Sequence, residues 1–157
     1  AGSVHYILIV SRYIQVLKVL LVLIIIAIGT GFLFGSSSDK HIIIIVNHKN
    51  PIHTIQQKEL KNIFYGRKIY WKDGSKIKIA DNLIPEIASN FFINFIGTSA
   101  SNIKKIWIKR MLRGRMSPPE SFRSRDELLA FVAKQKNAIS FVRSGPLPEG
   151  IREIGIK

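Results

Sequence analysis

Residues 19–34 are sixteen uncharged and mostly apolar residues in a row, too many to leave in contact with water. Arg12 and Lys18 precede this run, and the small residues 35–37 follow it. A basic flank, an apolar stretch and small residues at its end are the layout of an export signal. A buried core helix is the alternative, but the run has no polar face to turn to solvent.

The length of the apolar run leaves two fates open. A cleavable signal has an apolar region of about 7–15 residues, and a membrane-spanning helix needs about 20. The run falls between them, so residues 1–38 are predicted to be either a signal peptide or an uncleaved membrane anchor. The positive flank places residues 39–157 outside the cytoplasm in both cases.

The predicted exported domain, residues 39–157, is strongly basic. Only Arg12 and Lys18 of the 24 Lys and Arg residues precede it, and all ten acidic residues lie within it, so its net charge is +12. The chain has no cysteine. This excludes a disulfide scaffold, a thiol nucleophile, cysteine-ligated metal sites and a lipid anchor on an N-terminal cysteine.

Hydrophobic periodicity predicts a small α/β layer structure for residues 39–157. Gly66 and Gly97 are placed to end two of the helices. Trp71 and Trp107, and the phenylalanines of residues 84–96, are expected in the core. The expected strands are residues 41–47, 76–80, 139–142 and 151–156, and the expected helices are residues 54–65, 84–96, 99–112 and 126–136.

Catalytic and metal-binding patterns are missing from the sequence. His48 and His53 have no carboxylate at metal-ligand spacing. The sequence contains no nucleophile elbow, phosphate-binding loop or dinucleotide fingerprint. We therefore expect a protein that is not an enzyme and has neither a metal nor a cofactor.

Six cations occur within twelve residues, and no acid lies between residues 102 and 119. Such a segment is a solvated helix face, a site for a small oxyanion, or a contact for a polyanion such as lipid headgroups or nucleic acid. Its aromatic residues share the apolar face of the helix and do not alternate with the cations, which disfavours nucleic acid. The six cations are Lys104, Lys105, Lys109, Arg110, Arg113 and Arg115.

Three stretches, in this order, resemble substrate-binding proteins of phosphate ABC transporters. Residues 59–78 resemble the family's helix, its IF-x-G-(K/R) turn and its W-x-D-G hairpin. Residues 107–119 are similar to its W…F-x-G-(R/K)…P-P stretch, and residues 126–142 to the helix and strand that end in P-G-A-I-G-Y-V. The matching residues of the first stretch are Ile63, Phe64, Gly66, Arg67, Trp71, Asp73 and Gly74.

The resemblance implies the α/β fold of a single lobe of a type II periplasmic binding protein, in the periplasm or at the outer face of a bacterial cytoplasmic membrane. Proteins of this family have two lobes and bind phosphate between them. The counterpart of the first lobe is not found before residue 41. The family's Arg…Gly-Ser-Gly-Thr phosphate motif is replaced by Ala-Asp-Asn-Leu-Ile-Pro at residues 80–85, and Pro85 supplies no N–H donor.

Two functions remain open at this point. One is a binding domain that holds phosphate or sulfate weakly, through Asn82 at a helix start and the cations Arg67, Arg113 and Arg115. The other is an accessory protein of the cell envelope that uses the lobe as a scaffold. Its cations at residues 104–110 would then contact a protein partner or an anionic membrane. An N-terminal segment that is not cleaved would also hold the protein at the membrane.

Overall fold

The computed structural model describes residues 12–19 and 41–157 of the chain, which divides into two compact units, Ala1–Ser38 and Asp39–Lys157. Residues 12–19 are helical. Apart from Val19, the apolar run predicted as signal or anchor lies outside the described residues. Within the part that is described, no helix has both the length and the apolar character needed to cross a membrane.

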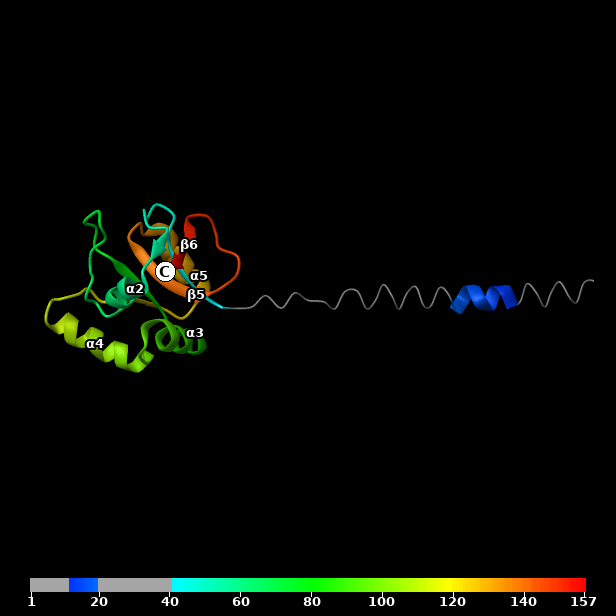
Figure 1. Cartoon of the computed structure of the whole chain (residues 1–157), viewed down its shortest axis with the longest axis horizontal. Helices are drawn as coiled ribbons and strands as arrows, with labels where there is room; N and C mark the ends of the chain where they lie inside the picture. Colours follow the sequence, from blue (N-terminus) through cyan, green and yellow to red (C-terminus); the bar gives the residue numbers. More distant parts are fainter. Residues whose placement is uncertain (1–11, 20–40) are drawn as a thin grey trace, which may run out of the picture. The chain divides into compact units, whose positions relative to one another are not determined.

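A six-stranded mixed sheet in the order β2-β6-β1-β5-β3-β4 forms the centre of residues 41–157 (Figure 1). β1 is antiparallel to β5 and β6, whereas β3 is parallel to β4 and β5. All six residues of β1 are buried, which confirms the strand predicted there. The strands are β1 (Ile42–Asn47), β2 (Thr54–Ile55), β3 (Lys78–Asn82), β4 (Glu120–Phe122), β5 (Ala138–Arg143) and β6 (Ile151–Ile156).

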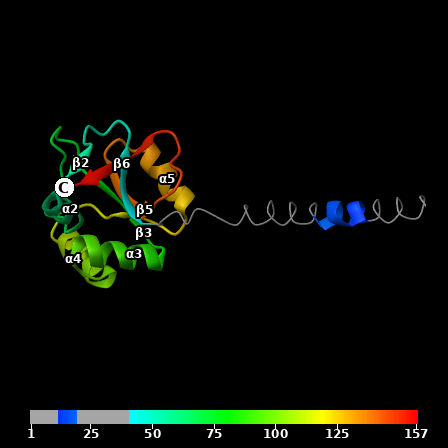
Figure 2. The same cartoon turned by 45° about the vertical axis from the view of Figure 1, so that its right-hand side comes forward.

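Helices cover both faces of the sheet (Figure 2). The face that we call the α4 face is covered by α2 (Gln57–Phe64), α3 (Pro85–Phe91), the π-helical η1 (Phe92–Ile96) and α4 (Ala100–Leu112). The opposite face, the α5 face, is covered by α5 (Arg125–Lys134). Alternation along each strand decides which face a side chain joins.

Aromatic rings fill the α4 face. Phe91 stacks on Phe141 with ring centroids 3.8 Å apart, and Phe92 meets the ring of Trp107 edge-on at 6.0 Å. The indole N–H of Trp107 donates to the carbonyl oxygen of Phe64 at 2.6 Å, so this large side chain is buried with its polar atom paired. The predicted burial of Trp71, Trp107, Phe91 and Phe92 is confirmed, and Phe95 is half-buried against the same core.

The α5 face is aliphatic, with Leu128, Leu129 and Val132 packed against the sheet. Asn47, at the end of β1, joins this face, and its Nδ2 donates to the carbonyl oxygens of Val132 at 2.9 Å and Ala133 at 2.7 Å. These two carbonyls belong to the last turn of α5, where the helix itself supplies no donor. Asn47 therefore fixes the end of α5 to the central strand.

Several element boundaries differ from the prediction, and two of them do so because of strand pairing. The helix predicted over residues 54–65 begins at Gln57, since Thr54–Ile55 pairs with β6 as β2. The strand predicted over residues 76–80 is Lys78–Asn82, and it runs to Asn82 because its last residues pair with β4, a strand that was not predicted. Asn82, expected at a helix start, is the last residue of β3.

Candidate functional site

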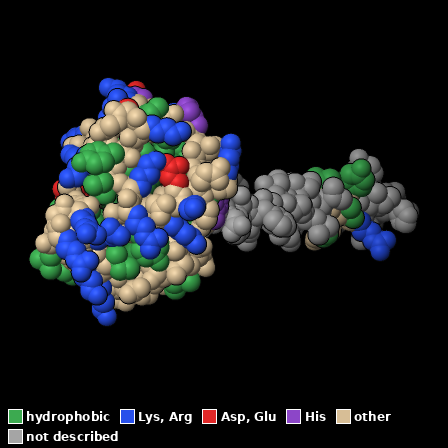
Figure 3. All heavy atoms as spheres, turned by 60° about the vertical axis from the view of Figure 1, so that its left-hand side comes forward, with side chains coloured by type: hydrophobic (Ala, Val, Ile, Leu, Met, Phe, Trp, Pro, Cys, Tyr) green, Lys and Arg blue, Asp and Glu red, His purple; other side chains and the backbone are tan. Residues whose placement is uncertain are grey.

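The C-terminal end of α4 and the turn after it bring four of the predicted cations together around one hollow. Figure 3 shows Lys and Arg side chains spread over the face of the molecule to which this helix belongs. The hollow has a volume of about 170 Å³, and no acidic residue lines it. We call it the basic hollow, and its lining residues are Ile106, Lys109, Arg110, Arg113 and Arg115.

Neighbouring contacts hold part of the basic hollow in place. Arg110 reaches across from α4, and its Nη1 donates to the carbonyl oxygen of Gly66 at 3.4 Å. Gly66 has a φ of 66° and lies so close to Met116 that a side chain there would collide with its sulfur. Arg67, the next residue, lies over the ring of Tyr65 with its guanidinium carbon 4.9 Å from the centroid. Arg67 does not itself line the hollow.

Asn82, the remaining predicted oxyanion ligand, is not among the residues of the basic hollow. Its side chain is buried, and both of its polar atoms have partners. Nδ2 donates to the carbonyl oxygen of Phe141 at 3.2 Å, and Oδ1 accepts from the N–H of Ile84 at 3.0 Å. These bonds shape the turn that leads from β3 into α3. The four residues predicted to bind an oxyanion therefore do not form one site. Asn82 supports a turn, whereas the three arginines lie on the basic surface.

Carboxylates occupy the first turns of α3 and α5. Glu86 lies in the first turn of α3, where it pairs with Arg143 at 3.1 Å, and two acids lie in the first turn of α5. Arg125 donates to the carbonyl oxygens of Arg143 at 2.7 Å and Pro146 at 3.1 Å. Because carboxylates already offset the positive end of each helix dipole, these helix starts attract a further anion only weakly.

Lys104 and Lys105 lie on the N-terminal half of α4 and face different surroundings. Lys105 lines a hollow of about 310 Å³ with Ile108 and Lys109 on the outside of the helix. Lys104 lines a pocket of about 300 Å³ between α4, β3 and the prolines before β4. This second pocket, which we call the Asp81 pocket, contains a functional group that the sequence reasoning missed.

Asp81 is 1% exposed, and neither carboxylate oxygen has a hydrogen-bond partner. Burial raises the pKa of Asp81 to about 6, and attraction to Lys104 opposes this shift. Residues with strongly shifted pKa values in pockets are candidates for function. In the sequence, Asp81 stands two residues after Ile79 in a strand pattern, which would have placed it on the buried face had the strand been extended.

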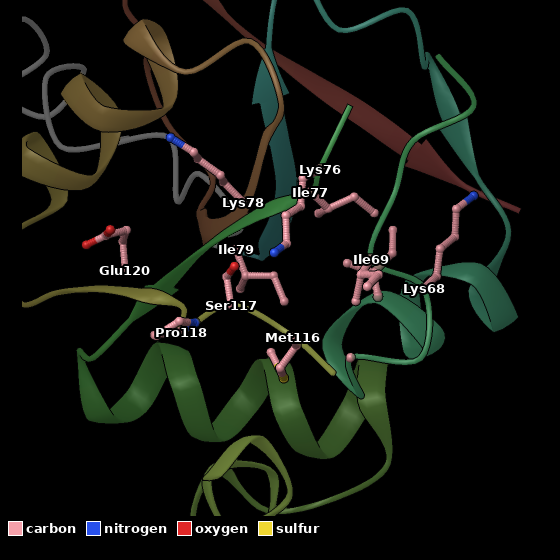
Figure 4. Close-up of a pocket in the computed structure, with 12 residues that line it drawn as sticks. Lys68, Ile69, Lys76, Ile77, Lys78, Ile79, Met116, Ser117, Pro118 and Glu120 are labelled. Atoms are coloured by element: carbon pink, nitrogen blue, oxygen red, sulfur yellow. The ribbon is translucent and has the colours of Figure 1, made fainter. Parts of the chain in front are cut away.

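Another hollow, of about 220 Å³, lies between the end of α2, residues 69–79 and Met116. Figure 4 shows Lys68 and Lys78 pointing away from it on either side. Lys68 forms an ion pair with Glu59, and the Nζ of Lys78 donates to Gln135 at 2.9 Å. This hollow is mostly apolar, and two of its lysines are engaged elsewhere. Among the described residues, no three His, Asp or Glu side chains cluster as metal ligands do.

Neither a protein-family model nor a curated protein matches the chain. Solved structures do match. One is a putative phosphate ABC transporter substrate-binding protein with bound phosphate from Clostridium perfringens, with a TM-score of 0.58 and 14% identity over 74% of this chain and 45% of that chain. Another is PstS from Borrelia burgdorferi, with a TM-score of 0.54 and 14% identity over 74% and 47%.

A third similar structure is a possible phosphate binding protein from Planctomyces limnophilus, with a TM-score of 0.55 and 12% identity over 75% of this chain and 42% of that chain. The chain thus spans less than half the length of each of the three. At these identities the likeness concerns the fold. It confirms the predicted fold class, an α/β lobe like that of phosphate-binding proteins.

Proposed function

We propose that this protein is a non-enzymatic, exported binding domain that holds a small oxyanion such as phosphate or sulfate weakly at the basic hollow. The observation that carries the proposal is the meeting of Lys109, Arg110, Arg113 and Arg115 around one hollow with no acidic lining residue. Arginine side chains bind oxyanions through paired N–H donors, and their charge strengthens each hydrogen bond.

The expected affinity is low for two physical reasons. The hollow lies at the C-terminal end of α4, and the partial negative charge of the helix dipole at this end opposes an anion. The cations Arg113 and Arg115 are also exposed, so water and salt screen their charge. A dissociation constant in the millimolar range follows. Likeness to binding proteins of phosphate transporters supports an oxyanion as the ligand class.

Calorimetric titration of the full chain with phosphate and with sulfate tests this proposal. The double variant Arg113→Gln/Arg115→Gln should weaken binding roughly tenfold, because half of the cations of the hollow are lost. Lys72→Gln, which neutralises an exposed lysine elsewhere, is the control and should leave the affinity unchanged. Absence of heat at millimolar ligand, or equal binding by the double variant, would refute the proposal.

The outer surface of α4 favours a second candidate function, contact with an anionic membrane or protein partner in the cell envelope. Ile108 and Leu112 lie one turn apart on this helix and are 52% and 84% exposed. Lys105 and Lys109 flank them. Exposed apolar residues beside cations are typical of helices that lie on anionic membrane surfaces, where each cation contributes about 1 kcal/mol.

Recovery of the full chain with sedimented vesicles separates the two candidates. The double variant Lys105→Glu/Lys109→Glu should reduce the excess recovery on anionic over neutral vesicles. Lys49→Glu/Lys72→Glu changes the net charge equally at exposed positions elsewhere and should not reduce it. If the contact is with a protein, capture of that protein from membranes should depend on Lys105 and Lys109 in the same way. Equal recovery of both variants would exclude this surface.

A further inference from the structure

The side chain of Asp81 differs from the other buried polar side chains of the sheet. Asn47, Asn82 and Ser140 are as buried as Asp81, and each forms side-chain hydrogen bonds. Neither oxygen of Asp81 has such a partner. A buried carboxylate without hydrogen bonds destabilises a fold. Its presence therefore points to a role other than stabilising the structure.

The Asp81 pocket lies against this carboxylate, whose oxygens are themselves covered, so a ligand in the pocket reaches them through a small shift of the lining side chains. The pocket has a volume of about 300 Å³, enough for a small organic molecule. Its walls are mostly apolar, and Lys104 and Ser121 are its other polar residues. The apolar lining consists of Leu83, Trp107, Ile108, Met111, Pro118 and Pro119.

The chemistry of the pocket selects a cationic hydrogen-bond donor. A carboxylate in apolar surroundings gains most from a group that supplies both a positive charge and N–H donors. Lys104 attracts Asp81 but forms no hydrogen bond with it. We propose that the Asp81 pocket binds a small primary amine, with the ammonium group on the Asp81 carboxylate and an alkyl or aryl group against Trp107 and Met111.

This site is separate from the basic hollow, because no residue is shared between the two linings. The two sites also require ligands of opposite charge. The charged residues of the basic hollow are all cations, which repel ammonium compounds, whereas the Asp81 pocket has a buried acid. Failure of one proposal therefore leaves the other standing.

Trp107 supplies a direct readout, since it lines the pocket and is one of only two tryptophans in the chain. In the full chain carrying Trp71→Phe, the fluorescence of Trp107 is followed during titration with phenethylammonium chloride. The neutral 2-phenylethanol and the anionic 3-phenylpropionate are matched in shape and test the charge requirement. We expect saturable binding of the amine and at least tenfold weaker binding of the other two compounds.

Two variants test the assigned roles. Asp81→Asn keeps the shape of the side chain and should weaken amine binding at least tenfold, while Asp73→Asn, which alters an exposed acid in a turn, should not. Lys104→Met removes a like charge near the ammonium group and should tighten amine binding severalfold. Thermal unfolding of each variant checks that it is folded.

Three results would overturn the proposal. The first is no fluorescence change with the amine at millimolar concentration, the result expected if the ammonium group of Lys104 closes onto Asp81 instead. The second is equal binding of amine by the folded Asp81→Asn variant. The third is a tenfold loss of binding in Lys104→Met, which would show that the ligand needs an anionic group paired with this lysine.

Discussion

The two faces of the sheet treat buried polar side chains in opposite ways. On the α5 face, Asn47, Asn82 and Ser140 all reach carbonyl oxygens through side-chain hydrogen bonds. On the α4 face, Asp81 has no such bond and lies beside a pocket. Asp81 and Asn82 are adjacent in β3, so the contrast arises from the side of the sheet that each one faces.

The contrast separates polar groups that support the fold from one that does not. A hydrogen-bonded polar group in the core contributes about 1 kcal/mol to stability, whereas an unpaired one costs about 1–3 kcal/mol. The α5 face therefore uses its polar residues to fix α5 and the strand ends. The α4 face obtains its stability from packed aromatic rings and keeps a carboxylate that weakens it.

The largest expected effect tests the aromatic packing of the α4 face. Trp107→Ala removes a buried ring and its hydrogen bond to Phe64, and it should lower the free energy of unfolding by about 3–5 kcal/mol. Urea unfolding of the full chain measures this loss. Leu112→Ala, on the exposed side of the same helix, is the control and should change stability little. A loss below about 1 kcal/mol for Trp107→Ala would contradict the packing described.

The next effect tests the paired groups of the α5 face. Asn47→Asp replaces the NH₂ donor with an oxygen that would face the carbonyl oxygens of Val132 and Ala133. We expect a loss of about 2–4 kcal/mol near neutral pH, because two hydrogen bonds become repulsive contacts. Chemical unfolding measures it, and the unchanged stability of an Asn94→Asp control, at an exposed position, would show that the effect is local. A neutral result at Asn47 would refute its role.

On the α4 face, the reverse exchange of an aspartate for an asparagine should raise the free energy of unfolding. Asp81→Asn removes a charge whose burial is unfavourable, so this variant should be more stable than the wild type near neutral pH, by at most about 3 kcal/mol. Thermal and urea unfolding measure the gain. Loss of stability in Asp81→Asn would show that the carboxylate is paired in solution, and the contrast between the faces would then fail.

The pH dependence of stability gives this prediction a second readout. Burial raises the pKa of Asp81 from its ordinary value of 3.8 to about 6 in the folded chain, and Lys104 is the charged group that opposes the rise. The folded state therefore binds more protons between about pH 4 and 6, and the contribution of Asp81 to stability falls as the pH rises through this window. Asp81→Asn should remove this fall, while Asp73→Asn should not.

Much of the fold follows from periodicity, and the deviations have a common cause. The apolar stripe of residues 84–96 and the buried run of β1 are local patterns, and both are confirmed. β2 and β4 are only two and three residues long and form through pairing with distant strands. Such short strands have no periodicity of their own, so the sequence does not indicate them.

The candidate sites also differ in whether nearby or distant residues form them. The cations of residues 109–115 lie within seven residues of one another, at the end of α4 and in the turn after it, so their grouping in the basic hollow could be predicted from their closeness in the sequence. The Asp81 pocket depends on contact between β3 and α4, more than twenty residues apart in the chain. Hydrophobic patterns contain no information on such contacts. Asn82, which was expected at a helix start, belongs for the same reason to a buried strand.

The smallest expected effect compares two serine hydroxyls. The hydroxyl of Ser140 is buried and donates to the carbonyl oxygen of Ala80 at 2.7 Å, whereas Ser121 is exposed at the Asp81 pocket. Ser140→Ala should cost about 1 kcal/mol, and Ser121→Ala should leave stability within about 0.5 kcal/mol of the wild type. Urea unfolding resolves this difference. Equal losses of stability in the two variants would contradict the contrast between the faces. The contrast requires that a hydrogen-bonded buried hydroxyl stabilises the fold more than an exposed hydroxyl at the pocket.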